Sequence, residues 1–223
     1  MISVVVPALN ADATLGAALA AVRDSPLVGE IVVADGGSRD ATVATAQSLG
    51  ARAIAAARGR GNQLAAGAAA SGGEWLLFLH ADCRLEPGWD KAARRFIEGP
   101  GAGERAGYFV FALDDPGAAA RRLERLVAQR CRVLALPYGD QGLLISRRLY
   151  QAVGGFAPIP LMEDVDIVRR LGRRRLQPIA ARAVSSARRY REGGYIRRPL
   201  RNLLCLSLYF TGMPPARLLR LYG

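Results

Sequence analysis

The stretch Trp75-Leu-Leu-Phe-Leu-His80-Ala-Asp82-Cys-Arg-Leu85 decides the fold class of this chain. It begins as an uninterrupted apolar run, which is typical of a strand buried on both faces of a parallel sheet. The run then ends at a histidine and an aspartate, two residues that a buried strand does not need. Because ligands of open α/β sheets bind beyond the carboxyl ends of the strands, His80 and Asp82 are candidate functional residues.

The chain before this stretch repeats a strand–turn–helix pattern. Strands are predicted at residues 2–6, 30–34 and 51–57, and each is followed by a segment with helical spacing. This repetition predicts an α/β fold with a doubly wound, mostly parallel sheet and helices on both faces. Predicted strands at 108–113 and 142–145 indicate antiparallel additions in the second half. We expect one domain over residues 1–223.

The net charge of +12 is concentrated at the C-terminal end. Residues 167–223 contain 14 Arg and one acid, Glu192, and so carry +13, whereas the rest holds 17 bases and 18 acids and carries −1. Residues 195–222 mix arginines with leucines and aromatics at helical spacing, interrupted by Pro214-Pro215. Such basic helices either lie on an anionic membrane surface or pack on their own domain with a solvated basic face, and the sequence leaves both open.

The cysteines and the apolar pattern predict a cytoplasmic protein. Cys83, Cys131 and Cys205 lie far apart without C-x-x-C spacing, which favours reduced thiols over a disulfide or a zinc site. The sequence has no uninterrupted run of the ~18 apolar residues that a membrane span requires. Met1 leads directly into a strand-like segment, so no secretory leader is expected. A peripheral position at the inner face of the membrane, and a homo-oligomer, are both left open.

Four polar clusters follow predicted strands or begin predicted helices: Asp35; Arg58 to Asn62; His80 with Asp82; and Glu163, Asp164 and Asp166. The first three should line one cleft, because successive parallel strands end at the same edge of a sheet. A single Asp after a strand is more often a turn or cap residue. Its coincidence with the other clusters favours a ligand for Mn²⁺ or Mg²⁺, which proteins hold with one or two carboxylates plus phosphate oxygens.

Two of these clusters need a choice between interpretations. Arg58-Gly-Arg-Gly61 approaches the dinucleotide fingerprint G-x-G-x-x-G, but Leu64 stands at the third glycine and the segment follows the third strand, so we reject NAD or FAD binding. What remains is a helix N-terminus beside two arginines, which suits a phosphate. The three acids at 163–166 complement a helix dipole, but their mutual repulsion also favours one of them as a general base.

Together these residues resemble family 2 glycosyltransferases of the GT-A fold. The resemblance is carried by four motifs in order: Val4-Val-Val-Pro-Ala-Leu-Asn10, Val33-Ala-Asp-Gly-Gly-Ser-Arg-Asp40, His80-Ala-Asp82 and Met162-Glu-Asp164. It is greatest to a compact soluble subgroup marked by D-G-G-S and H-A-D. It implies inverting transfer from a nucleotide-diphosphate sugar to an acceptor hydroxyl on a small or lipid-linked molecule. Residues 1–100 would form the nucleotide-binding half, 101–172 the acceptor and catalytic half, and 173–223 a basic helical extension.

The resemblance also implies roles for individual residues. The nucleotide would be bound by Pro7, Asn10, Asp35, Arg58, Arg60 and Asn62, with Asp35 on the base. The metal ion would be held by Asp82, with His80 assisting, and Asp164 would be the catalytic base. On the acceptor side we place Asp140, Gln141 and Glu163, although Asp140 can also simply shape a turn. Trp89 and Tyr138 could stack on a sugar, but core positions are favoured for both.

The sequence departs from the family pattern at two motif positions. His80 replaces the first Asp of D-x-D, and Gly36 replaces the second acid of the usual D-D-G-S. The Q-x-x-R-W motif and the membrane spans of processive members are absent from the sequence. These departures leave the metal affinity and the identity of the sugar undecided.

Two other functions compete with the transferase. A nucleotidyltransferase would carry a glycine-rich basic loop after the first strand, and Pro7-Ala-Leu-Asn10 is not one. A non-catalytic basic module that binds membrane or nucleic acid has no reason to place acids at successive strand ends. We therefore favour the transferase, and we expect no nucleic-acid partner.

Overall fold

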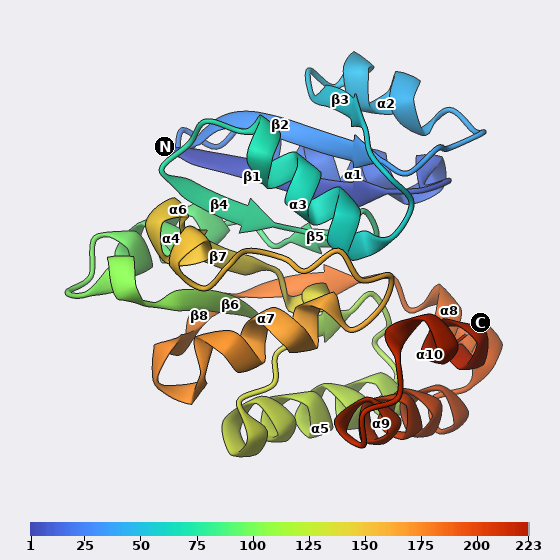
Figure 1. The fold of residues 1–223 in the computed structure, drawn as a ribbon. Coiled ribbons are helices and arrows are strands. Elements are labelled where there is room, and N and C mark those ends of the chain that lie inside the picture. The colour runs from blue at the N-terminus through green and yellow to red at the C-terminus, as the bar shows by residue number, and fades with distance from the viewer. Residues whose placement is uncertain (223) are drawn as a thin grey trace.

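The structure is a computed structural model that describes residues 1–222, with the backbone alone for Tyr222 (Figure 1). These residues form one mixed sheet whose eight strands lie in the order β3-β2-β1-β4-β7-β6-β8-β5. The strands are β1 (Ile2–Ala8), β2 (Val28–Asp35), β3 (Arg52–Ala55), β4 (Trp75–Phe78), β5 (Cys83–Leu85), β6 (Ala106–Leu113), β7 (Leu143–Ser146) and β8 (Leu176–Ser185).

The first half of the sheet is parallel and the second half is mixed. β1 pairs in parallel with β2 and β4, and β2 pairs in parallel with β3. β7 is antiparallel to β4 and β6, and β5 is antiparallel to β8, whereas β6 and β8 are parallel. The predicted sheet, mostly parallel with antiparallel additions, is therefore confirmed. The N-terminal register brings the ends of β1 and β2 level, because Ala8 is opposite Asp35.

Helices cover both faces of the sheet, as predicted. One face packs against α1 (Asp12–Arg23), α2 (Thr42–Ser48) and α4 (Trp89–Ile97). The other packs against α3 (Arg60–Ala70), α6 (Arg147–Ala152), α7 (Glu163–Leu171), α9 (Arg197–Phe210) and α10 (Pro215–Tyr222). The remaining helices are α5 (Ala118–Leu134), which packs on β6, α8 (Arg188–Gly193), and the 3-10 turns η1 (Ala102–Glu104), η2 (Gly139–Gln141) and η3 (Arg173–Arg175).

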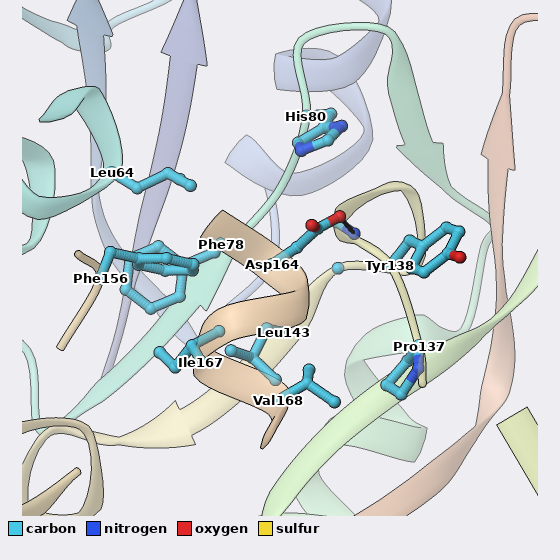
Figure 2. Close-up of a pocket in the computed structure, with 12 residues that line it drawn as sticks. Leu64, Phe78, His80, Pro137, Tyr138, Leu143, Phe156, Asp164, Ile167 and Val168 are labelled. Atoms are coloured by element: carbon cyan, nitrogen blue, oxygen red, sulfur yellow. Dashed lines mark hydrogen bonds between the residues drawn. The ribbon is translucent and has the colours of Figure 1, made fainter. Parts of the chain in front are cut away.

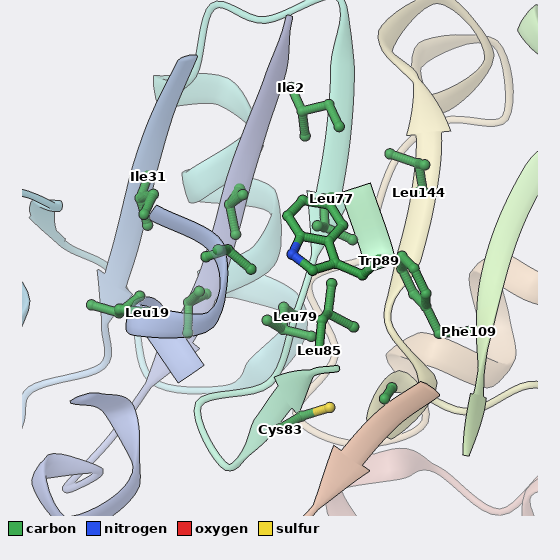
Figure 3. Close-up of a cluster of buried hydrophobic side chains, with 14 of the residues drawn as sticks. Ile2, Leu19, Ile31, Leu77, Leu79, Cys83, Leu85, Trp89, Phe109 and Leu144 are labelled. Atoms are coloured by element: carbon green, nitrogen blue, oxygen red, sulfur yellow. The ribbon is translucent and has the colours of Figure 1, made fainter. Parts of the chain in front are cut away.

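A hydrophobic core fills the space between the sheet and its first helical face. Leu19 of α1 and Trp89 of α4 belong to this core together with Ile2 of β1 and Leu77 of β4 (Figure 3). The Trp89 indole N–H donates to the carbonyl oxygen of Ala21 at 3.0 Å. Trp89 is thus a core residue, as the sequence favours. The three cysteines are buried free thiols, as predicted.

The C-terminal quarter differs from the predicted helical extension. Residues 176–185 form β8, which lies between β6 and β5, and the helices of this region begin only at Arg188. Pro178 and Arg182 interrupt the apolar pattern of β8, and its partners are far away in sequence, so no local period reveals the strand. In the described part of the chain, no helix combines the length and apolar content that crossing a membrane requires.

Candidate active site

A cleft of about 680 Å³ opens at the carboxyl ends of β1 and β4, where the sequence predicts it. The end of β1, the loops after β1, β3 and β4, and the start of α3 bring six predicted site residues to its wall: Pro7, Asn10, Arg58, Arg60, His80 and Asp82. These residues are far apart in the sequence. The parallel order of β1, β2 and β4 is what gathers them at one edge of the sheet.

Asn10 and Asp35 organise the loops at one end of the cleft. Asn10 adopts a left-handed backbone (φ 49°), and its Oδ1 accepts from the Arg39 N–H at 2.9 Å, which ties the loop after β1 to the loop after β2. Both carboxylate oxygens of the buried Asp35 serve its own turn. Oδ2 accepts from the N–H groups of Gly37 and Ser38 at 3.0 and 2.9 Å, and Oδ1 accepts from the Ser38 hydroxyl. Asp35 is not among the residues that line the cleft.

Gln63 is a cleft residue that the sequence pattern did not predict. Its buried amide donates to the carbonyl oxygens of Ala8 (2.7 Å) and Ala34 (2.9 Å), and so it joins the ends of β1 and β2 beneath the cleft. The predicted Asn62 instead donates to the carbonyl oxygen of Arg58 at 3.1 Å and shapes the entry to α3. The only sequence signal for Gln63 was a glutamine next to a run of small apolar residues in α3.

The start of α3 is held against the loop before α7 by a glycine. A Cβ on Gly61 would lie 2.2 Å from the carbonyl oxygen of Ala157 and 2.6 Å from that of Ile159, so no other residue fits without backbone movement. The Gly61 N–H donates to the Ile159 carbonyl at 3.2 Å. This close approach brings Arg60 beside Glu163, whose Oε1 lies 3.5 Å from the Arg60 Nε.

His80 and Asp82 both line the cleft, and together they offer ligands for a cation. Burial, reinforced by the Arg60 charge, lowers the pKa of His80 to about 4, so its imidazole is neutral near pH 7 and keeps a lone pair. The Asp82 carboxylate lies 3.9 Å from an Arg189 Nη1. Within residues 1–222 no three His, Cys, Asp or Glu side chains are grouped to hold a metal ion. A neutral imidazole and one carboxylate fit a divalent cation whose other ligands are phosphate oxygens and water.

Three arginines near the C-terminal end also line the cleft, in a segment that the sequence predicts as a basic helical extension and not as part of the nucleotide site. They are Arg188 and Arg189 of α8 and Arg198 of α9. With Arg58 and Arg60 they surround a single lining acid, Asp82. A cleft lined in this way attracts anionic ligands. The loss of acids after Asp166 was the sequence signal for this positive wall.

Asp164 lies at the meeting point of two smaller pockets beside the cleft. One, of about 20 Å³, shares His80 with the cleft, and the other, of about 50 Å³, shares Arg60 with it. Figure 2 shows the Asp164 carboxylate at the start of α7, with the Tyr138 ring beside it. The Asp164 Oδ2 accepts from the Gly139 N–H at 2.8 Å. The loop before β7 therefore fixes the orientation of this carboxylate.

The loop that holds Asp164 also contacts His80 and presents Tyr138. A Cβ on Gly139 would lie 2.4 Å from the His80 Nε2, so the glycine backbone packs directly on the imidazole. Tyr138 is half-buried and lines both small pockets, whereas the sequence favoured a core position. The guanidinium carbon of Arg130 lies 3.4 Å from the Tyr138 ring centroid and covers it. Tyr138 thus belongs to the site as well as to the neighbouring core.

The other two acids of the 163–166 cluster have different surroundings. The Glu163 side chain is 1% exposed, and burial raises its pKa to about 7 in spite of the nearby Arg60. It lies behind Arg60 and is not a lining residue of the cleft or of the two small pockets. Asp166 Oδ2 accepts from the Arg170 Nε at 3.0 Å, one turn along α7. Of the three acids, Asp164 is the one that lines the small pockets.

Asp140 and Gln141 follow Tyr138 and Gly139 in η2. The Asp140 Oδ1 is buried without a hydrogen-bond partner, and its pKa is raised to about 6, chiefly by burial and further by the charges of Asp164 and Asp82. The Gln141 side chain is used inside the protein. Its amide donates to the Phe109 carbonyl oxygen at 3.0 Å, and its Oε1 accepts from Arg130 at 3.2 Å. Gln141 therefore fixes the loop and does not line the pockets beside Asp164.

Comparison with known proteins supports an enzyme of sugar transfer. The sequence profile described as Glycosyl transferase family 2 matches residues 3–143, more than half of the chain. The match includes the strand ends that carry Asn10, Asp35 and Asp82 and stops before Asp164. A search of curated proteins gave no match.

Solved structures with the same fold include a sugar-transferring enzyme. Glucosyl-3-phosphoglycerate synthase from Mycobacterium tuberculosis, in complex with Mn²⁺, UDP and glucosyl-3-phosphoglycerate, is 25% identical with a TM-score of 0.63, over 92% of this chain and 78% of that chain. The same enzyme in complex with Mn²⁺, UDP-glucose and glycerol 3-phosphate is 25% identical with a TM-score of 0.63, over 92% of this chain and 79% of that chain. A mycobacterial protein of known crystal structure is 26% identical with a TM-score of 0.61, over 92% of this chain and 74% of that chain.

The profile match and the shared architecture agree with the family that the sequence resembles. The sheet, its covering helices and the cleft at the ends of β1 and β4 are those of a GT-A-like fold. The chain belongs to glycosyl transferase family 2.

Proposed function

We propose that this protein transfers a sugar from a nucleotide-diphosphate sugar to an acceptor hydroxyl, with inversion at the anomeric carbon and Asp164 as general base. One observation carries the proposal: Asp164 lines pockets that share His80 and Arg60 with the positive cleft. A donor in the cleft and an acceptor beside Asp164 would meet between these two residues. Family membership favours this function over a nucleotidyltransferase or a non-catalytic module.

The diphosphate of the donor has a matching environment in the cleft. The N-terminus of α3 supplies the positive end of a helix dipole, with Arg58 and Arg60 beside it, although its Gly61 N–H already donates to the Ile159 carbonyl. Arg188 and Arg189 add charge from the opposite wall. The nucleoside would lie toward Pro7 and Asn10. For Asp35 to contact the base, as the family resemblance implies, its carboxylate would need to leave part of its own turn.

A divalent cation, Mn²⁺ or Mg²⁺, would be held by Asp82 with the neutral imidazole of His80. The presence of Mn²⁺ with UDP in glucosyl-3-phosphoglycerate synthase supports this assignment. When bound, the cation supplies positive charge for the departing diphosphate. Arg189, already 3.9 Å from Asp82, contributes charge at the same point.

The chemical step that we propose is a single in-line displacement. The acceptor oxygen bonds to the anomeric carbon while the bond from that carbon to the diphosphate oxygen breaks, and the acceptor proton passes to Asp164. The hydrogen bond from the Gly139 N–H holds the carboxylate in place at 2.8 Å. Tyr138 would offer an aromatic wall for the acceptor or the sugar. Glu163 positions Arg60, which it approaches to 3.5 Å.

Binding and product analysis together test the proposed function. The unfolding temperature would be measured with a panel of nucleotide sugars, with and without Mn²⁺, and the product of the best donor would be examined for anomeric configuration by NMR. We expect one donor to stabilise the protein, more so with Mn²⁺, and to give the inverted product. Retention would contradict the single displacement. Formation of pyrophosphate from a nucleoside triphosphate and a sugar phosphate would favour the nucleotidyltransferase instead.

The acceptor, whether small or lipid-linked, would be identified by the same product analysis. A cytoplasmic location and a homo-oligomer stay predictions of the sequence. The aromatic and arginine side chains beside Asp164 suit an acceptor that carries both an apolar and an anionic part.

A further inference from the structure

The outward face of α9 is mostly apolar, with the exposed Ser207 as a polar residue within it, which reverses the usual pattern of a surface helix. Four residues on it are about half exposed or more: Leu200 (59%), Leu203 (57%), Leu204 (54%) and Phe210 (47%). Ile196, just before the helix, is 73% exposed. At 100° per residue these five positions fall within one third of the helix circumference, while Cys205 on the opposite side is buried. The solvated basic face that the sequence allowed is therefore not what α9 presents.

Exposed arginines lie on the same two helices as this apolar stripe, which consists of Ile196, Leu200, Leu203, Leu204 and Phe210. Arg197 is exposed at the start of α9, and Arg217 and Arg220 are exposed on α10, which packs against α9. Leu219 and Leu221 of α10 add further exposed apolar area, at 46% and 48%. Monomeric proteins rarely expose apolar side chains in such continuous groups, except where something covers them.

We propose that α9 and α10 form a docking surface for an anionic lipid bilayer. The apolar stripe would enter the region between headgroups and acyl chains, and the exposed arginines would contact anionic headgroups. At 14 residues, α9 is shorter than the ~20 that span a bilayer, so it would lie along the surface. The exposed Arg197, Arg217 and Arg220 of these two helices complement an anionic membrane.

The same charge argues against a second copy of the chain as the occupant. A two-fold symmetric dimer would bring identical surfaces together, and each would carry the exposed arginines of α9 and α10. The repulsion between them would oppose the apolar contact. A bilayer instead matches both features at once. Because Arg198 and Leu219 also line the cleft, docking would hold the cleft close to the membrane.

Vesicle flotation of the full-length protein tests the docking surface without any assay of activity. Vesicles of phosphatidylcholine alone would be compared with vesicles that also contain phosphatidylglycerol. We expect strong binding only to the anionic vesicles. Arg217→Gln with Arg220→Gln should weaken it roughly 25-fold and reduce its salt dependence, since each basic residue near an anionic surface contributes about fivefold. Leu200→Gln with Leu203→Gln should weaken it at least ~10-fold at every salt concentration.

Matched variants on other helices serve as controls. Lys91→Gln with Arg95→Gln removes two exposed cations from α4, and Leu126→Gln with Val133→Gln removes two exposed apolar side chains from α5. Both should bind anionic vesicles as the unaltered protein does, and all variants should unfold at a similar temperature. Equal loss in the control variants would overturn the assignment to α9 and α10. So would a dimer in solution that Leu200→Gln with Leu203→Gln dissociates, in the absence of any vesicle binding.

Discussion

Two glycines, Gly61 and Gly139, allow close backbone contacts that position Arg60 and His80. Gly61 lets the carbonyl oxygens of the 157–159 loop reach α3, and Gly139 lets a loop backbone touch His80. In both cases a Cβ would fall within 2.4 Å of another heavy atom. The two contacts differ in cost, because Gly61 meets rigid backbone whereas Gly139 meets an imidazole that can rotate.

Gly61→Ala should destabilise the protein by about 1–3 kcal/mol, the range found when atoms are forced into a packed site. The measurement is urea unfolding of the variant beside the unaltered protein. Gly16→Ala in α1 is the matched control, since the nearest atom to its Cβ lies at 4.0 Å. That substitution should be neutral or stabilising by up to about 1 kcal/mol, because alanine favours helix. An equal effect at the two positions would refute the close contact at Gly61.

Glu163 should make stability depend on pH. Burial raises its pKa from 4.5 to about 7, so protonation favours the folded chain. The stabilising contribution of the protonated carboxyl is fully present below pH 4.5 and is lost as pH rises through about 7. Each unit of pKa shift corresponds to about 1.4 kcal/mol, which gives a loss of a few kcal/mol.

The comparison of unaltered protein with Glu163→Gln isolates this contribution. Urea unfolding at about pH 5 and about pH 8.5, on either side of the raised pKa, should show that the variant gains stability relative to the unaltered protein at the higher pH. Glu98→Gln, at a side chain that is 63% exposed, should leave the pH profile as it is. Parallel profiles for Glu163→Gln and the unaltered protein would show that Glu163 keeps an ordinary pKa.

At the level of elements, the sequence could predict what depends on local pattern. The β–α repeat indicated β1 to β4 and their helices, because apolar runs and helical spacing are properties of neighbouring residues. β8 could not be predicted in this way, since Pro178 and Arg182 break its pattern and its partners β6 and β5 are distant in the chain. The arginines of α8 were missed in the cleft for the same reason, because β8 is what carries them there.

The same distinction, between features set by local sequence and features set by contacts of distant segments, applies to the site. Asn10, His80 and Asp82 stand directly after strands, so topology alone places them at the cleft. The bonds that occupy Asp35 and Gln141 depend on loop conformations that no short motif encodes. Gln63 was missed because its role lies in bridging two strand ends from a helix.

Helix α8 should contribute to donor binding through its arginines. Arg189→Gln should weaken UDP binding about tenfold, the scale of one charge-assisted hydrogen bond. Isothermal titration with UDP and Mn²⁺ measures the change. Arg95→Gln on α4 is the control and should bind UDP normally, because Arg95 is not among the residues that line the cleft. Unchanged affinity in Arg189→Gln would remove α8 from the donor site.

On the scale of the whole molecule, arginine side chains and the candidate catalytic residues line adjoining cavities. The carboxyl ends of β1 and β4 open into a cleft that the basic C-terminal helices help to form. The pockets at Asp164 adjoin this cleft through His80 and Arg60. Arginines of residues 167–223 would thus serve two surfaces: Arg188, Arg189 and Arg198 line the proposed donor cleft, and Arg197, Arg217 and Arg220 are exposed on α9 and α10.

The turnover of Asp164→Asn tests the central claim most directly. It would be measured with the donor found in the panel, together with UDP affinity, and compared with Asp166→Asn on the same helix. Loss of general-base assistance should lower the rate of Asp164→Asn by ~10²–10⁴-fold while UDP still binds, and Asp166→Asn should stay close to normal. Unimpaired turnover in Asp164→Asn, with loss in Asp166→Asn or Glu163→Gln, would contradict the assignment of the base.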